Sequence, residues 1–333
     1  MGSITRRDFS RRSLLLAAAI GSGGLIGYGF LNKHSIMARN NLLRMGHCAP
    51  SVMQTLLGIS NPETNNMILA SGGMAGGIAG SETECGALTA PIMFLSFTNN
   101  NIQGIPEKIE LIEKARSYYN AFTELNGSPF CSRIRYSGGQ SACRKAVCRF
   151  HKTYKGAVND PLSLSPETRK SFSLLLEAFN ENKFHCAHNV LDNLPANFAV
   201  SGELYDSSWI FIGGIALLNR TCGALAAGVM ALSSVTSEIE NSYSRVAKMN
   251  RMLKKNDQHA LDEEINEFNR AINLSEELGS WFRNEFGSFT CRDIWGYDFT
   301  RYEDAVNFIN GHCMEICSKN IAAMVARQVS SML

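Results

Sequence analysis

Cysteine is the residue of this 333-residue chain whose number and placement suggest chemistry. Ten cysteines are too many to be ordinary core residues and too few to form a small disulfide scaffold of this length. A thiolate is a soft ligand, and four thiolates from one unit suit an iron–sulfur cluster or a structural zinc ion. Cysteines that hold no metal can instead form redox-active dithiols or structural disulfides.

The chain contains two copies of one cysteine pattern. Three short contexts recur: an early His-Cys-Ala, then Gly-Gly-Ile-Ala followed after five residues by Cys-Gly-Ala-Leu, and last Gly-Ser-x-x-Cys-x-x-Ile. The copies are His47-Cys48-Ala49 and His185-Cys186-Ala187, Gly76–Leu88 and Gly213–Leu225, and Gly127–Ile134 and Gly287–Ile294. The offset between copies changes from 138 to 137 and then to 160, so the second half has gained about 23 residues. A fourth cysteine follows in each half, Cys143 or Cys148 in the first and Cys313 or Cys317 in the second.

The spacing of the cysteines excludes several familiar sites. Successive intervals are 37, 46 and 12 residues in the first half and 36, 69 and 26 in the second, with no Cys-x-x-Cys anywhere. A zinc ribbon, a thioredoxin-like active site and covalent haem c each require a local Cys-x-x-Cys, so all three are disfavoured. Dispersed cysteines can still converge when each comes from a different helix of one bundle.

The repeated residues resemble the C-GCAxxG-C-C family of redox-active proteins, and more distantly the cluster-binding part of split-Soret cytochrome c. The likeness covers nearly everything after residue 40, and it implies two compact helical units. Position by position, the family's four cysteines would fall on Cys48, Cys85, Cys131 and Cys143, and on Cys186, Cys222, Cys291 and Cys317. Cys143 and Cys317 are chosen because each precedes a β-branched residue by four places, Val147 and Ile321, as the family's last helix tends to show. Cys148 and Cys313 are then extra cysteines of secondary interest.

These residues predict a redox protein in which each half holds an iron–sulfur cluster for electron transfer. Three alternatives stay open: a metal-free thiol/disulfide redox protein, a site for structural zinc, and a non-redox helical binding module held together by disulfides. An electron-transfer or oxidoreductase component is favoured over a hydrolase or a transferase, because no catalytic triad or nucleophile elbow occurs. The redox partner protein is not identified by the sequence.

His47 and His185 are secondary candidates, because each precedes the first cysteine of its half. Adjacent side chains on a helix point about 100° apart, so Cys and His cannot easily share one metal ion there. We therefore expect supporting or helix-packing roles for the two histidines.

The glycine-rich run from Gly72 to Gly80 fits neither G-x-G-x-x-G nor a P-loop, so no nucleotide site is predicted. Gly72, Gly76 and Gly80 stand at helical spacing, which favours close helix packing. Backbone N–H groups near a cluster are the alternative for the same glycines.

The elements that must position these residues are expected to be helices. Proline is scarce, with 8 residues, and 45% of the chain is apolar, which favours an all-α fold with a substantial core. We predict two tandem homologous helical-bundle repeats, 35–155 and 156–333, with a solvent-facing helical insertion near 237–278 that is broken at Asn256-Asp257. Helices are predicted to start at Pro106 and at Ser165-Pro166. The net charge of +2 gives no field that would attract nucleic acid.

The N-terminus is expected to be a targeting segment rather than part of the folded domain. Thr5-Arg6-Arg7-Asp8-Phe9 resembles the twin-arginine export signal, and an apolar run follows from Ser13 to Leu31. We therefore expect residues 1–34 to engage the twin-arginine translocase and to be either removed or retained as a membrane anchor. The rest of the chain would lie in the periplasm or on the outer face of the cytoplasmic membrane.

Overall fold

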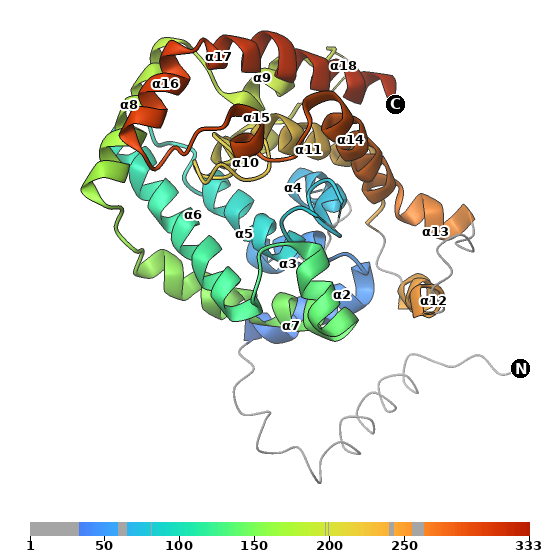
Figure 1. Ribbon diagram of the computed structural model, residues 1–333. Helices are drawn as coiled ribbons and strands as arrows, with labels where there is room; N and C mark the ends of the chain where they lie inside the picture. Colours follow the sequence, from blue (N-terminus) through green and yellow to red (C-terminus); the bar gives the residue numbers. More distant parts are fainter. Residues whose placement is uncertain are drawn as a thin grey trace, which may run out of the picture.

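The computed structural model describes residues 33–333 except 59–64, 81, 197, 199, 240–242 and 255–262. The regular elements of these ranges are helices, and their only β-pairing consists of three isolated bridges. The prediction of an all-α fold is confirmed (Figure 1). The expected export segment, residues 1–34, lies outside the described residues except for its last two. Among the helices that are described, none is both long enough and apolar enough to cross a membrane.

In the described residues of the first repeat, seven helical segments precede the boundary between the repeats. They are α2 (Lys33–Met45), α3 (Cys48–Leu57), α4 (Asn66–Ala70), the 3-10 turn η1 (Gly72–Met74), α5 (Gly86–Phe97), α6 (Ile105–Asn126) and α7 (Cys131–Asn159). Helix α6 begins at Ile105, one residue before the predicted start at Pro106, and buries one apolar face. Helix α7 continues four residues beyond the predicted boundary at 155.

The second repeat follows the same order and adds elements. It contains α8 (Pro166–Glu181), α9 (Cys186–Asp192), α10 (Gly202–Ser208), η2 (Trp209–Phe211), α11 (Gly223–Thr236), α12 (Tyr243–Lys254), α13 (Glu263–Phe268), α14 (Arg270–Phe286), α15 (Cys291–Trp295), α16 (Tyr302–Asn310), α17 (Cys313–Ile316), the π-helical turn η4 (Cys317–Ala322) and α18 (Ala323–Ser331). Helix α8 starts as predicted, because the Ser165 side chain accepts a hydrogen bond from the N–H of Thr168. Helices α3, α4, α5 and α6 thus correspond to α9, α10, α11 and α14.

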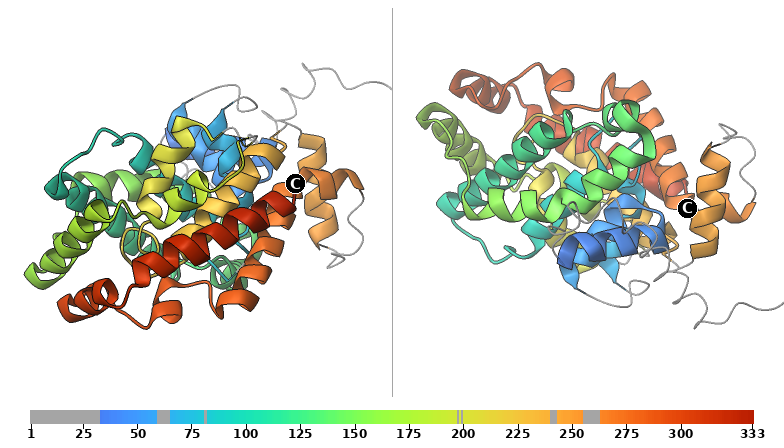
Figure 2. Two further views of the ribbon diagram at one scale, coloured as in Figure 1. Left: turned by 90° about the horizontal axis from the view of Figure 1, so that it is seen from above. Right: turned by 90° about the horizontal axis from the view of Figure 1, so that it is seen from below.

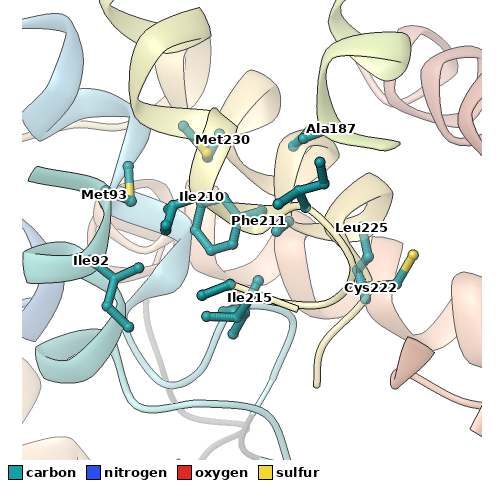
Figure 3. Close-up of a cluster of buried hydrophobic side chains, with 14 of the residues drawn as sticks. Ile92, Met93, Ala187, Ile210, Phe211, Ile215, Cys222, Leu225 and Met230 are labelled. Atoms are coloured by element: carbon teal, nitrogen blue, oxygen red, sulfur yellow. The ribbon is translucent and has the colours of Figure 1, made fainter. Parts of the chain in front are cut away.

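The two repeats interlock reciprocally. Helix α4 of the first repeat packs on α11 of the second, and the corresponding α10 of the second packs on α5 of the first. Serine hydroxyls support this packing, since Ser96 of α5 donates to the carbonyl of Asp206 in α10, and Ser233 of α11 accepts from the N–H of Gly73 in η1, the turn that follows α4. One continuous hydrophobic cluster consequently contains residues of both repeats. Figure 3 shows part of it, with Ile92 and Met93 of α5 near Ile210 and Phe211 of η2.

The insertion differs from the expected solvent-facing hairpin. Helices α12 and α13 lie at one side of the molecule (Figure 2), and the predicted break at Asn256-Asp257 lies outside the described residues. Four of their side chains form a second apolar cluster, namely Val246, Met249, Ile265 and Phe268. This cluster packs against the first repeat, where the Phe268 ring stacks on His47 at 4.6 Å between centroids. The hairpin therefore covers the start of α3 instead of only facing water.

Candidate functional site

The first three cysteines of each repeat lie at helix N-termini. Cys48 and Cys131 are the first residues of α3 and α7, and Cys85 caps α5. Cys186, Cys222 and Cys291 occupy the same places at α9, α11 and α15. A helix N-terminus presents free N–H groups and a partial positive charge, which stabilise a thiolate or a bound anionic group. Each repeat thus brings three helix starts to one site.

Backbone hydrogen bonds hold the second and third cysteines of each site together. In the first repeat the N–H of Cys85 donates to the carbonyl of Pro129 at 2.8 Å, and the N–H of Cys131 donates to Thr83 at 3.0 Å. In the second repeat Cys222 donates to Phe289 at 2.8 Å and Cys291 to Arg220 at 2.9 Å. The β-bridges Glu84–Phe130 and Thr221–Thr290 are parts of these same two contacts.

The glycine after the second cysteine makes room for the sulfur of the first. A Cβ atom on Gly86 would lie 2.9 Å from Cys48 Sγ and 2.7 Å from the carbonyl oxygen of Met74. A Cβ atom on Gly223 would lie 2.5 Å from Cys186 Sγ and 2.3 Å from the carbonyl oxygen of Phe211. Both approaches are closer than van der Waals contact permits. The Cys-Gly pair of each repeat is therefore a packing requirement of the site.

The Gly-Gly segment before each second cysteine donates a backbone N–H to the site. The N–H of Gly76 faces the sulfur of Cys48 and the N–H of Gly213 faces the sulfur of Cys186, and each favours the ionised thiolate and so lowers its pKa. The glycine run is not the single helical face that its spacing suggested, because Gly76, Gly77 and Gly80 have positive φ angles. Close packing is found for Gly72 and Gly73, where a Cβ atom would meet serine side chains, and for Gly77, where it would meet the carbonyl of Gly80. Gly76 instead fits the alternative prediction, in which backbone N–H groups of this run lie near the cysteines.

The second copy of this segment has an unusual backbone. Five consecutive residues, Gly213 to Leu217, have φ between 51° and 73°. Left-handed backbone costs a non-glycine residue about 1–2 kcal/mol, and Ile215, Ala216 and Leu217 are all non-glycine. Their side chains are fully buried, so packing offsets this strain. The strain is stored directly beside Cys186, as is common at functional sites.

The fourth cysteine reaches each site through a helix irregularity. Twelve residues of straight helix would separate Cys131 from Cys143 by about 18 Å. Helix α7 instead breaks at Gly138 and Gly139, and Cys131 and Cys143 interact electrostatically. In the second repeat the expected last helix is interrupted at Gly311 and His312, and Cys317 begins the π-helical turn η4. The indole N–H of Trp295 donates to the sulfur of Cys317.

The four thiols of the first site differ in their pKa values. The S–H of Cys85 donates to the sulfur of Cys48, which lowers the pKa of Cys48 to about 7 and raises that of Cys85 well above 9.0. Burial raises the pKa of Cys131 to about 12, and the charge of Cys48 adds to this effect. Burial likewise raises the pKa of Cys143 to about 11, again with a contribution from Cys48. Cys48 and Cys143 are half-buried, so this site is accessible from solvent.

The four thiols of the second site are all buried and all hold their protons more tightly than usual. Burial raises the pKa of Cys186 to about 12 and also raises that of Cys222. The pKa values of Cys291 and Cys317 rise well above 9.0, first through burial and then through repulsion by the other thiolates. Figure 3 shows Cys222 at the edge of the hydrophobic cluster, with its sulfur directed away from the other labelled side chains.

The two extra cysteines differ in position. Cys148 interacts electrostatically with Arg39, Arg144 and Arg149 and with no other thiol among its principal neighbours. Cys313 is buried at the start of α17 and contributes to the raised pKa of Cys291. The structure therefore places Cys313 beside the second site and Cys148 away from the first.

Both candidate histidines are engaged with groups other than the thiols. His47 Nε2 hydrogen-bonds Asn269 Oδ1 at 2.9 Å, and burial lowers the pKa of this ring. His185 Nδ1 accepts from the N–H of His188, and His185 Nε2 contacts the carbonyl of Trp209 at 2.9 Å. These contacts orient the helices that begin with Cys48 and Cys186.

The chemistry of the thiols limits which groups the two sites could hold. All ten cysteines lie in described ranges and are free thiols. Within those ranges no three His, Cys, Asp or Glu side chains converge tightly enough to hold a single metal ion. Four thiols that interact electrostatically at the junction of helix starts have the composition of an iron–sulfur ligand set. Sequence reasoning considered an N–H group near the cysteines for Gly76 but missed the equivalent role of Gly213, although both glycines recur at the same offset as the cysteines that follow them.

Comparison with known proteins identifies the repeated unit. The family model described as "Putative redox-active protein (C_GCAxxG_C_C)" matches residues 46–155 and again residues 184–327. An uncharacterized protein of Archaeoglobus fulgidus is 32% identical over 111 residues, which is 31% of this chain and 72% of that relative. No solved structure matches the chain. The chain therefore belongs to the C_GCAxxG_C_C family of redox-active proteins and contains that family's domain twice.

Proposed function

We propose that each repeat uses its four cysteines to hold an iron–sulfur cluster and that the protein transfers electrons between redox partners. The observation that supports this most is the electrostatic coupling of Cys48, Cys85, Cys131 and Cys143 in one site and of Cys186, Cys222, Cys291 and Cys317 in the other. Such a cluster, when bound, would accept and release single electrons.

The protein's own groups suit this role in three ways. Four thiolates in a buried site repel one another, so they ionise readily only when a cationic centre compensates their charge. The N–H groups of Gly76, Gly213 and Trp295 donate to sulfur, and hydrogen bonds of this kind raise the potential of a cluster. The apolar residues around the second site limit the access of water, which also affects the potential.

A metal-free dithiol at the first site is the second candidate, because one specific contact favours it. Cys48 has a pKa of about 7, is half-buried, and receives the S–H of Cys85. A thiolate at neutral pH next to a second thiol is the arrangement of a redox-active dithiol. Such a site would form a disulfide by losing two electrons and two protons to a thiol–disulfide partner.

We also propose that the protein is exported by the twin-arginine route and acts in the periplasm or at the outer face of the membrane. The support is the Arg6-Arg7 pair followed by an apolar run. Because that route carries folded cargo, it would allow a cluster to be inserted before export.

The test is an anaerobic purification of the full-length protein, followed by visible absorption and by iron and acid-labile sulfide analysis. We expect brown protein that dithionite bleaches. Cys143→Ser and Cys317→Ser should each remove about half of the iron, since each disables one of two sites. Cys148→Ser is the matched control and should leave the iron content unchanged. Colourless wild-type protein without iron or sulfide would refute the cluster and leave the dithiol as the better explanation.

A further inference from the structure

The two cysteine sites are joined through a buried contact on the axis that relates the repeats. Glu84 directly precedes Cys85, and Thr221 directly precedes Cys222, so the two residues are repeat counterparts at the offset of 137. Thr221 Oγ1 donates a hydrogen bond to Glu84 Oε2. Glu84 is 0% exposed and Thr221 is 1% exposed. The two equivalent positions thus touch each other, which only a residue close to the symmetry axis can do.

Each partner in this contact also sits between two cysteines of its own site. Glu84 is bonded to Cys85 along the chain and is bridged to Phe130, the neighbour of Cys131. Thr221 is bonded to Cys222 and is bridged to Thr290, the neighbour of Cys291. The path from one site to the other therefore consists of one peptide link, two side chains joined by one hydrogen bond, and a second peptide link.

Other groups hold the carboxyl group of Glu84 in place. The Tyr119 hydroxyl donates to Glu84 Oε1 at 3.2 Å, so each carboxyl oxygen has one donor. The Arg220 guanidinium lies 6.0 Å from the centroids of the Tyr119 and Phe130 rings and so contacts the first repeat from the second. A carboxyl group is costly to bury, and a simple packing contact between two repeats would not require one.

We propose that the Glu84–Thr221 hydrogen bond couples the two four-thiol sites, so that the redox state of one site changes the reduction midpoint of the other. A change of charge at Cys85 or Cys131 alters the field on Glu84, and the hydrogen bond passes this change to the backbone that precedes Cys222. At a buried position such a polar link acts strongly because the local dielectric is low. This coupling rests on the proposed redox use of both sites.

The experiment is a double-mutant cycle on the full-length protein prepared anaerobically. Cys143→Ser disables the first site, Thr221→Val removes the hydroxyl of the link, and the double variant completes the cycle. The midpoint of the second site is followed optically where iron is present. It is also followed by alkylation of Cys222 and mass spectrometry after equilibration with graded ratios of reduced and oxidised dithiothreitol.

We expect Cys143→Ser to shift the redox equilibrium constant of the second site about fivefold or more when Thr221 is intact. In the Thr221→Val background the same change should shift it by less than about twofold. Tyr119→Phe is the matched control, because it removes the other donor to the same carboxyl group within one repeat and should preserve the coupling. Thr221→Ser, which keeps the hydroxyl, should preserve it as well.

An equal shift in both backgrounds, or no shift in either, would overturn the proposal. If Thr221→Val does not fold, as judged by circular dichroism, Glu84→Met breaks the link from its other end and takes its place in the cycle. Iron and sulfide are measured on the same samples. Their absence would refute the cluster, while the titration of Cys222 would still decide whether the sites are coupled.

Discussion

Gly223→Ala should distort the second cysteine site while leaving the helix that carries it otherwise unchanged. Gly223 is the first residue of α11, where alanine is conformationally acceptable, so backbone propensity does not oppose the change. The new methyl group would instead lie 2.3 Å from the carbonyl oxygen of Phe211 and 2.5 Å from Cys186 Sγ. Normal contacts are about 3.5–4.0 Å, so α11 must move away from η2 or the thiol must move away from the site.

The cost can be estimated from the atoms that resist this movement. One of them is a backbone carbonyl in a segment whose residues are fully buried, so it cannot simply rotate away. Overpacking of this kind costs about 1–3 kcal/mol. In a protein of this size that corresponds to a fall in Tm of about 2–6 °C. The corresponding Gly86→Ala should cost less, because its closest approach is 2.7 Å.

The assay is thermal unfolding followed by circular dichroism, with Gly202→Ala as the control. Gly202 is also the first residue of a helix, α10, but a Cβ atom there would meet nothing within 4 Å. That substitution should be neutral or should stabilise the protein by up to about 1 kcal/mol. If Gly223→Ala proves as stable as Gly202→Ala, the close approach of Cys186 to α11 is not a constraint and the explanation of the Cys-Gly pair is wrong.

Three further predictions follow from the ionisation and packing of named groups. In metal-free protein, alkylation of Cys48 should reach half of its maximal rate near pH 7. Cys85→Ala should move this midpoint to higher pH because the S–H donor is lost. Equal pH profiles of wild type and variant would show that Cys85 does not lower the pKa of Cys48. Burial raises the pKa of Glu84 above its ordinary 4.5, so the free energy of unfolding that depends on the protonated carboxyl group is present below that pH and is lost as pH rises. Glu84→Gln should reduce the decrease in the free energy of unfolding between pH 5 and pH 8, as measured by denaturant unfolding. Phe268→Ala should increase hydrogen exchange at the start of α3, where His47 loses its cover, and not at the start of α9; an unchanged exchange rate would show that the insertion does not protect that site.

The helical class, the duplication and the two sets of cysteines follow from local features of the sequence. Pro106 and Ser165 mark helix starts because first-turn backbone groups need only nearby partners, and both starts are found where they were predicted. The repeats are recognisable because each cysteine keeps its immediate neighbours. The interruption between α16 and α17 at Gly311 and His312 was not among the predicted features.

Which side chains meet was decided only by the tertiary structure. Helical periodicity indicates which face of a helix is buried but not which helix will cover it. Three contacts join residues more than 100 positions apart in the sequence. They are the reciprocal packing of α4 on α11 and of α10 on α5, the stacking of Phe268 on His47, and the hydrogen bond between Thr221 and Glu84. The break at Gly138 and Gly139 likewise brings Cys143, twelve residues along the chain, close enough to Cys131 for the two thiols to interact electrostatically. The sequence by itself determined the helical class, the duplication and the repeated cysteines. Only the packing of distant helices against one another brought the thiols of each set near enough to interact, because such contacts depend on shape complementarity across the whole core.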